Sequence, residues 1–190
     1  MSKLLLKQIH ACTVCSEYLP NPPRPTINFH PDAEIMIIGQ APGRLAHVNH
    51  KPWSDPSGNR LRSWLNVTPE EFYDARRFAL IPMGFCYPGT DIKGGDFPPR
   101  SECAPLWHAK IRKQLKNLRL TLLVGQYSQK FYLGNKRKAS MTETVNSYRD
   151  YLPNFLPLPH PSWRNTVWLK KHPWFESEVL PVLRQLIRSN

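Results

Sequence analysis

Four short apolar runs, with helical periodicity between them, are the main secondary-structure signal in this chain. The runs are continuous rather than alternating, and they cover Glu34 to Gly39, Phe78 to Met83, Leu120 to Gly125 and Phe155 to Leu158. The remaining segments space apolar residues three and four apart, which predicts helices over 58–67, 104–117, 128–133, 141–151 and 174–188. Continuous apolar strands are typical of a sheet buried on both faces. We therefore expect an α/β fold, a three-layer αβα arrangement around a short, mainly parallel, four-stranded sheet.

Two loops rich in turn-forming residues follow the first and last of these strands. GQAPG covers Gly39 to Gly43, and HPSWRN covers His160 to Asn165. Glycine and proline permit tight turns that bring the backbone close to a ligand, and the polar side chains can bond a polar ring or a phosphate. Ligands bind beyond the carboxyl ends of parallel strands. We therefore expect the two loops to form one composite site.

Length and charge narrow the class of protein. A chain of 190 residues with 41% hydrophobic content is expected to form a single domain over residues 1–190, with an N-terminal arm over 1–30. No apolar stretch approaches the roughly 20 residues of a membrane span, and the N-terminal apolar run is too short for a secretory signal. We expect a cytoplasmic monomer with no membrane partner. The formal charge of +12 suits binding of a polyanion, although a merely soluble basic surface has the same composition.

The four cysteines form two pairs. Cys12 and Cys15 make a C-x-x-C motif, and Cys86 and Cys103 are separated by sixteen residues. Disulfides are rare in the expected compartment. Four thiolates can instead close a tetrahedral zinc site or hold a 4Fe-4S cluster, because both centres take soft anionic ligands. Spacing alone does not choose between these metals, and four unconnected buried thiols are the remaining alternative.

Several motifs together resemble the uracil-DNA glycosylase superfamily. They are GQAPG, the KPW and DPSG segments between Lys51 and Gly58, the HPSxRN loop and the basic helix after it. The cysteine pattern is similar to that of the iron-sulfur branch, which implies a structural 4Fe-4S cluster on Cys12, Cys15, Cys86 and Cys103, with structural zinc as the alternative. The resemblance implies a base excision repair enzyme, a DNA glycosylase. Such an enzyme hydrolyses the N-glycosidic bond of a flipped damaged base, uracil or another deaminated base, in single- or double-stranded DNA.

The resemblance also assigns roles to individual residues. Trp53 would stack on the base, unless it only fills the core, and His160 would donate a hydrogen bond to the developing negative charge on the base. The other base-binding positions would be Gly39, Gln40, Ala41, Pro42, Gly43, Met83 and Gly84. The DNA-binding positions would be Ser162, Trp163 as a wedge, Arg164, Asn165, Lys170 and Lys171. Asn165 is equally suited to bracing its own loop.

Two positions depart from the family pattern at the step that activates water. Ala41 stands where the best-known members have aspartate, and Gln40 stands where the iron-sulfur branch usually has glutamate. Gln40 could orient a water but cannot accept its proton. Asp55 is the nearest carboxylate in the motif region, with capping of the following helix as its alternative role. His47 and His50 are further candidates for the water.

A third departure concerns selectivity for the base. The asparagine that reads the uracil edge in the iron-sulfur branch has no counterpart among Ile81, Pro82 and Met83. Recognition would then depend on backbone groups between Met83 and Phe85, or the substrate is another base. Two other functions stay open, a catalytically weak or inactive DNA-binding module that senses damage and a hydrolase of small molecules or nucleotides that reuses the fold.

Overall fold

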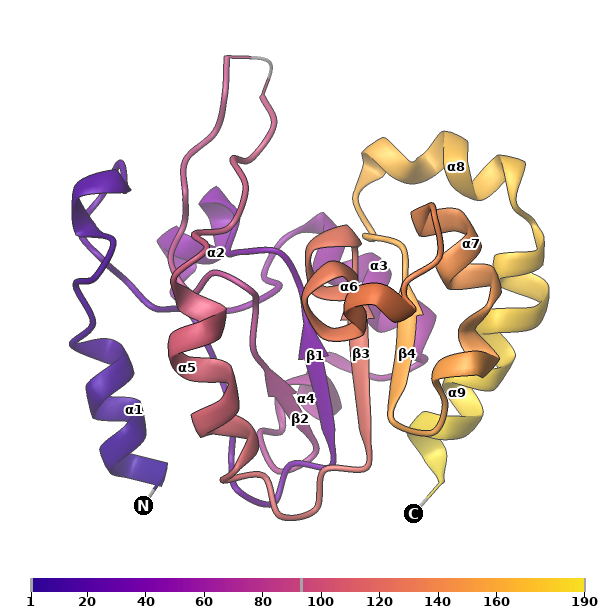
Figure 1. Ribbon diagram of the computed structural model, residues 1–190, viewed down its shortest axis with the longest axis horizontal. Coiled ribbons are helices and arrows are strands. Elements are labelled where there is room, and N and C mark those ends of the chain that lie inside the picture. The colour runs from indigo at the N-terminus through magenta and orange to yellow at the C-terminus, as the bar shows by residue number, and fades with distance from the viewer. Residues whose placement is uncertain (1, 93, 190) are drawn as a thin grey trace.

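The computed structural model describes residues 2–92 and 94–189, which fold around a four-stranded parallel sheet (Figure 1). Its strands are β1 (Ile35–Ile38), β2 (Phe78–Leu80), β3 (Leu120–Val124) and β4 (Phe155–Leu158). The strand order is β2-β1-β3-β4, and each neighbouring pair is parallel. The expected α/β class and four-stranded sheet are confirmed, and the described sheet is parallel throughout.

Helices cover both faces of the sheet. One face packs against α3 (Pro56–Leu65), α4 (Pro69–Tyr73), α7 (Met141–Asn146) and α9 (Leu180–Arg188). The other face packs against α1 (Ser2–His10), α5 (Cys103–Arg112) and α6 (Gln126–Leu133). Two short helices, α2 (Arg44–Asn49) and α8 (Thr166–Lys171), lie beyond the carboxyl ends of the strands (Figure 1). Tight 3-10 turns occupy Ser16–Tyr18, Gly134–Lys136, Tyr148–Tyr151 and Trp163–Asn165.

The continuous apolar strands are explained by burial on both faces. In β1, Ile35 and Ile37 belong to the core beneath α3 and α9, whereas Met36 and Ile38 belong to the core beneath α1 and α5. Successive strand side chains point to opposite faces. Each of these four side chains is fully buried, so a polar residue at any of them would face a core.

The structure differs from the expected elements mainly at their ends. The helix expected over 141–151 ends at Asn146, and Tyr148–Tyr151 continues as a 3-10 turn. The helix expected over 104–117 begins at Cys103 and ends at Arg112. The helix expected over 174–188 opens with a wide π turn over Phe175–Val179, because Pro181 has no N–H for a bond to the preceding turn. β2 ends at Leu80, two residues before Pro82. The short helices α2 and α4 carry too few turns to give a periodic signal. α1 has nine residues, with Leu5 and Ile9 buried, and was not expected from the sequence.

The strand order places the site. The chain moves from β1 outward to β2 and, later, from β3 outward to β4, so β1 and β3 flank the point where the winding reverses. The loops after β1 and β3 diverge there and leave a crevice. A long hairpin between β2 and α5, held by an antiparallel bridge between Thr90 and Asp96, extends past this edge of the sheet (Figure 1). Across the described residues, none of the helices combines the length and apolar character that crossing a membrane requires.

Candidate active site

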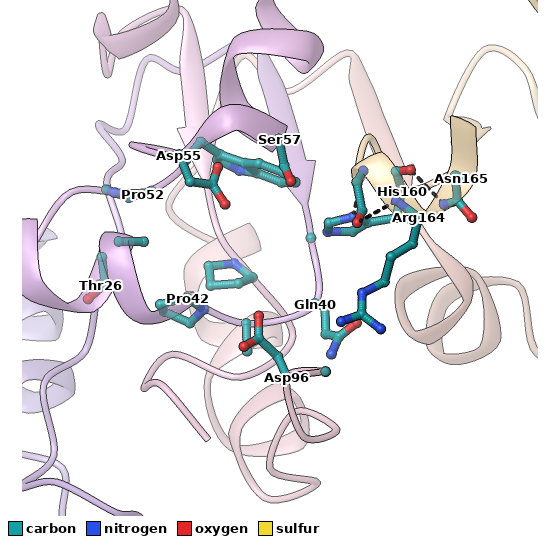
Figure 2. A pocket seen from close by; sticks show the side chains of 18 of the residues that line it. Thr26, Gln40, Pro42, Pro52, Asp55, Ser57, Asp96, His160, Arg164 and Asn165 are labelled. Atoms are coloured by element: carbon teal, nitrogen blue, oxygen red, sulfur yellow. Dashed lines mark hydrogen bonds between the residues drawn. The ribbon is translucent and has the colours of Figure 1, made fainter. Parts of the chain in front are cut away.

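A cavity of about 430 Å³ lies beyond the carboxyl ends of the strands. Most of its walls come from the loop after β1, the connection between α2 and α3, the hairpin before α5 and the loop after β4 (Figure 2). Single residues from three other segments, Thr26, Pro82 and Gln126, complete the lining. The predicted residues that line it are Gly39, Gln40, Ala41, Pro42, Gly43, Trp53, Asp55, His160, Ser162, Arg164 and Asn165. The structure therefore brings the two sequence loops together in one cavity, of a size typical of ligand pockets.

Trp53 lies against the end of β1 because glycine leaves room for its indole. A Cβ atom on Gly39 would lie 2.6 Å from Cζ2 of Trp53, and one on Gly58 would lie 1.8 Å from the Trp53 carbonyl oxygen. Trp53 has a left-handed φ of 56°, which is unusual for a bulky residue. The guanidinium of Arg62 donates to its carbonyl at 3.2 Å. Such a conformation costs free energy and persists where the surroundings enforce it, which is common at functional sites.

His160 stacks on Trp53 and has a defined tautomer. The two ring centroids are 5.7 Å apart and the planes differ by 29°. The Ser162 N–H donates to Nδ1 of His160 at 3.3 Å, so in the neutral ring the proton lies on Nε2. Burial lowers the pKa of His160, and the charge of Asp55 acts in the opposite direction. The neutral imidazole therefore offers an Nε2–H donor at this cavity at neutral pH.

The loop that carries His160 is braced from several sides. The Asn165 amide donates to the His160 carbonyl at 2.7 Å, and the Arg60 guanidinium donates to the Ser162 carbonyl at 3.1 Å. The Ser162 hydroxyl accepts from the Arg164 N–H at 3.3 Å. Gly125, at the end of β3, has a φ of 88° and lies under His160, where a Cβ would be 3.5 Å from that of His160. Asn165 thus has the bracing contact that was the alternative to a DNA contact.

Two carboxylates point into the cavity, Asp55 and Asp96 (Figure 2). Asp55 caps α3, with Oδ1 accepting from the Gly58 N–H at 2.8 Å. Oδ1 of Asp96 accepts from the Thr90 hydroxyl at 3.1 Å. Burial raises the pKa of the Asp96 carboxyl, as does the charge of Asp55, whereas the Thr90 hydroxyl and Arg164 lower it. Asp55 therefore has its predicted alternative role as a cap and also lines the cavity.

Two side chains from the motif loops fasten the hairpin on either side of Asp96. The Gln40 amide donates to the Phe97 carbonyl at 3.2 Å. The Arg164 guanidinium donates to the Gly94 carbonyl at 2.8 Å. Figure 2 shows Gln40, Arg164 and Asp96 converging at one end of the cavity. The hairpin thus forms one wall of the cavity rather than a detached loop.

Several predicted residues lie elsewhere. Met83 and Gly84 are not among the cavity-lining residues, and their N–H groups donate to the carbonyls of Gly39 and Gln40 at 2.9 and 3.0 Å. Trp163 is 73% exposed beside the cavity. Lys170 and Lys171 are exposed on α8, and Lys170 borders a separate groove with Arg60 and Arg184. His47 lies on α2 and His50 directly follows it; neither lines the cavity.

The four cysteines converge beside the base of the hairpin. All are free thiols, and Cys15, Cys86 and Cys103 are buried. Burial raises the pKa of Cys86 to about 11 and that of Cys103 to about 12, and the charges of neighbouring cysteines act in the same direction. Within residues 2–92 and 94–189, no three His, Cys, Asp or Glu side chains are placed to bind a single metal ion. The donor set of neighbouring thiols nevertheless fits a soft metal centre, which would supply the positive charge that thiolates need.

Sequence reasoning missed four polar residues of the cavity, Thr26, Ser57, Asp96 and Gln126. Gln126 follows Gly125 at the end of β3, just as Gln40 follows Gly39 at the end of β1. This repeated Gly-Gln after a buried strand is a signal that could have located it. Asp96 gives only a weak signal, an acidic residue in a Gly- and Pro-rich loop, because its place depends on how the hairpin folds back.

Comparisons with known proteins point to one family. The family model described as the Uracil DNA glycosylase superfamily matches residues 27–184. This span includes both motif loops, the hairpin and the second cysteine pair, while Cys12 and Cys15 precede it. A solution NMR structure of a Methanosarcina acetivorans protein, named as a candidate uracil DNA glycosylase, is also similar. It matches with a TM-score of 0.47 and 17% sequence identity, covering 83% of this chain and 93% of that chain.

Proposed function

Because this chain belongs to the uracil DNA glycosylase superfamily, we propose that it hydrolyses the N-glycosidic bond of a damaged base in DNA. The substrate base is uracil or another deaminated base, extruded from the helix as base excision repair requires. The observation that carries this proposal is the pairing of Trp53 with His160 at the wall of the cavity. This pair combines an aromatic surface on which the base can stack with a hydrogen-bond donor for the negative charge that develops on the departing base.

The base would lie in the cavity against Trp53 and the first motif loop. The Trp53 indole, which lies over Gly39, offers a stacking surface, and Gly43 adds no side chain to the cavity wall. Pro42 and Ala41 complete an apolar edge. No asparagine at Ile81 to Met83 is available to read uracil, so selectivity among deaminated bases would depend on Gln40, Gln126 and backbone groups.

His160 would stabilise the departing base. When the glycosidic bond breaks, negative charge develops on the base oxygen, and a fixed donor in a cavity poor in water lowers the energy of that transition state. Nδ1 is occupied by the Ser162 N–H, which directs the Nε2 proton of the neutral ring to this task. The lowered pKa of His160 keeps the ring neutral, so it donates without first adding a full charge.

DNA outside the cavity would bind to the basic and aromatic residues around it. Arg164 and Ser162 lie at the cavity mouth, the exposed Trp163 is suited to fill the gap left by the flipped base, and Lys170 and Lys171 extend the basic surface along α8. The formal charge of +12 supports a polyanionic partner.

Cys12, Cys15, Cys86 and Cys103 would hold a 4Fe-4S cluster with a structural role. Four cysteine thiolates are a donor set that a 4Fe-4S cluster takes, with structural zinc as the alternative. Such a centre would tie the N-terminal arm to both ends of the hairpin that forms a wall of the cavity. Iron and sulfide in anaerobically purified protein are the expected result. Stoichiometric zinc in colourless protein would contradict the proposed 4Fe-4S cluster. A stable, metal-free Cys86→Ser variant with full activity would contradict it as well.

The test of the function is base excision from oligonucleotides carrying uracil, hypoxanthine, xanthine or oxidised pyrimidines, in single- and double-stranded form. We expect the wild type to release a deaminated base. His160→Ala should lower the single-turnover rate at least about 100-fold with DNA affinity nearly unchanged, because the lost donor acts mainly in the transition state. Equal losses of rate and affinity would instead assign His160 a structural role.

An inactive DNA-binding module is the second candidate. The observation that favours it is the absence of a carboxylate at Gln40 and Ala41. It predicts salt-dependent affinity for damaged DNA without excision of any base in the panel. No affinity for DNA at any salt concentration would exclude both candidates and leave a small-molecule hydrolase.

A further inference from the structure

We infer that Asp96 is the group that accepts the proton of the attacking water, in place of the carboxylate missing from the first motif loop. This inference depends on the proposed glycosylase function and adds a catalytic residue to it. Asp96 lies outside both motif loops in the sequence, on the hairpin between β2 and α5, yet its carboxylate enters the same cavity as His160 and Trp53 (Figure 2).

One oxygen of Asp96 is held and the other faces the cavity floor. Oδ1 accepts from the Thr90 hydroxyl at 3.1 Å. Oδ2 faces Gly43, since the Cβ of an alanine at that position would lie 3.3 Å from Asp96 Oδ2 and 4.0 Å from Asp55 Oδ2. Gly43 carries no side chain, so the two carboxylate oxygens face a common point above its backbone. A water molecule at that point would lie within or near hydrogen-bond reach of Asp96.

Asp96 is better placed than Asp55 to act as the base. Oδ1 of Asp55 is occupied by the Gly58 N–H, so this carboxylate already serves as the N-terminal cap of α3. Burial of the Asp96 carboxyl raises its pKa and so favours the protonated form. Of the charges that face it, Asp55 acts in the same direction and Arg164 acts in the opposite direction. A carboxylate that is harder to keep ionised is a stronger proton acceptor.

Gln40 has a role in this arrangement that its family counterpart does not require. Its amide holds the Phe97 carbonyl, next to Asp96, while Arg164 holds the Gly94 carbonyl on the other side. Each motif loop therefore fixes the hairpin at one side of Asp96. Gln40 is therefore a positioning residue. Asp96 of the hairpin takes the place of the carboxylate that the first motif loop lacks near position 40.

The hydrolysis needs only water, Asp96 and His160. The oxygen of water forms a bond to C1′ of the deoxyribose, and the C1′–N bond breaks with its electron pair leaving on the base. The water proton passes to Asp96, and the base anion is held by the Nε2–H of His160. The proton on Asp96 then returns to the base or to solvent, which leaves the free base, an abasic sugar and an ionised Asp96.

Asp96→Asn provides the main test, because the amide keeps the shape but cannot accept the proton. We expect single-turnover excision to fall about 100-fold or more with DNA affinity within about threefold of wild type. The rate of the wild type should decrease at acid pH as Asp96 becomes protonated, and Asp96→Asn should lack this acid limb. Gln40→Ala should lower the rate less and retain the limb, as expected of a positioning residue.

Gly43→Ala provides an independent test of the water position. Gly43 has an ordinary φ of −75°, so alanine is compatible with the backbone, but its methyl group would occupy the point shared by the two carboxylates. We expect a loss of rate of about tenfold or more with unchanged thermal stability. Asp91→Asn is the matched control on the same hairpin, where Asp91 accepts from the Gly95 N–H at 2.9 Å and does not line the cavity.

The outcomes separate this inference from the function on which it depends. A wild type that excises no base overturns the proposed function itself. An active wild type with Asp96→Asn of equal rate and an intact acid limb overturns the role of Asp96 alone. An equal loss in Asp91→Asn and Asp96→Asn would mean that the hairpin fold, not the Asp96 carboxylate, is what the reaction needs.

Discussion

At the scale of single residues, two glycines determine where Trp53 lies. Gly39 leaves space for the indole ring and Gly58 leaves space for the Trp53 carbonyl. The two close contacts differ in kind, because one is to a side chain and the other to the backbone. Methyl groups at the two positions should therefore have separable effects on activity and on stability.

We predict that Gly39→Ala mainly affects catalysis. Its methyl group would lie 2.6 Å from Trp53 Cζ2, and the ring would move away from the wall it shares with His160. Misplacement by a fraction of an ångström to one ångström typically costs up to about 100-fold in rate. Single-turnover excision should fall about 10- to 100-fold, with a loss in the free energy of unfolding of about 1 kcal/mol.

Gly58→Ala is the matched comparison, and it should mainly affect stability. Its methyl group would lie 1.8 Å from a backbone oxygen, so the start of α3 must shift. We expect a loss of about 3 kcal/mol in the free energy of unfolding, measured by urea denaturation. Gly39→Ala with a normal rate, or Gly58→Ala with normal stability, would contradict this division.

The sequence identified the site residues that lie within recognisable motifs. It missed the residues that reach the cavity only through the way the chain folds. His160, Trp53, Gln40 and Asp55 lie in short segments whose residue types signal a ligand site, and all four line the cavity. Asp96 reaches the same cavity from a hairpin 41 positions after Asp55. No local pattern specifies how that hairpin folds back, because the contacts that fix it come from Gln40 and Arg164.

At the scale of secondary-structure elements, strands were predicted better than helices. Each of the four apolar runs contains one of the four strands, because burial on both faces leaves a continuous signal. Helix ends depended on contacts that the sequence pattern does not contain, such as the break after Asn146. Short helices with one or two turns, such as α2 and α4, are held by their caps and neighbours rather than by periodicity.

His108 joins three of these elements and makes their packing sensitive to acid. It lies on α5, where its ring nitrogens are 2.8 Å from the Tyr132 hydroxyl of α6 and 3.0 Å from the Pro82 carbonyl after β2. Burial lowers the pKa of His108 to about 4 from an ordinary value of 6.5. In the unfolded chain it takes up a proton below about pH 6.5, whereas in the fold it stays neutral until about pH 4.

We predict that stability falls as the pH decreases from about 6.5 to about 4. The unfolded state binds the extra proton in this window, so His108 should account for a loss of about 3 kcal/mol. His108→Gln should be less stable at pH 7 but show a smaller decrease toward pH 4, measured by urea denaturation at several pH values. His10→Gln, at an exposed position of α1, is the control. Equal pH dependence in wild type and His108→Gln would refute the assignment.

At the scale of the whole molecule, the positive charge is expected to act through particular surfaces. The charge of +12 is spread over the chain, and we expect the basic residues near the cavity to contact a bound DNA backbone. Lys170 and Lys171 lie on α8, on the same edge of the molecule as the cavity, whereas α1 lies on the opposite side (Figure 1). The salt dependence of binding counts the phosphate contacts that each surface makes.

We predict that replacing both Lys170 and Lys171 by glutamine weakens DNA binding and reduces its salt dependence. Each lost phosphate contact should lower the slope of log affinity against log salt by about 0.9 for duplex DNA. Titrations between low and moderate salt measure this slope. The matched control replaces Lys3 and Lys7 of α1, which are exposed and should leave the slope unchanged. A change of equal size in the control would indicate that net charge alone governs binding.

The direction of the strands also determines which side of the protein a linker or solid support would occupy. The two ends of the described chain, at the start of α1 and the end of α9, lie at the edge of the sheet where the strands begin, and the cavity lies at the edge where they finish (Figure 1). A linker, a fluorophore or a solid support joined through either end would leave the cavity mouth facing away from the attachment. In an immobilised sample, the site proposed for DNA would therefore stay open to the solution.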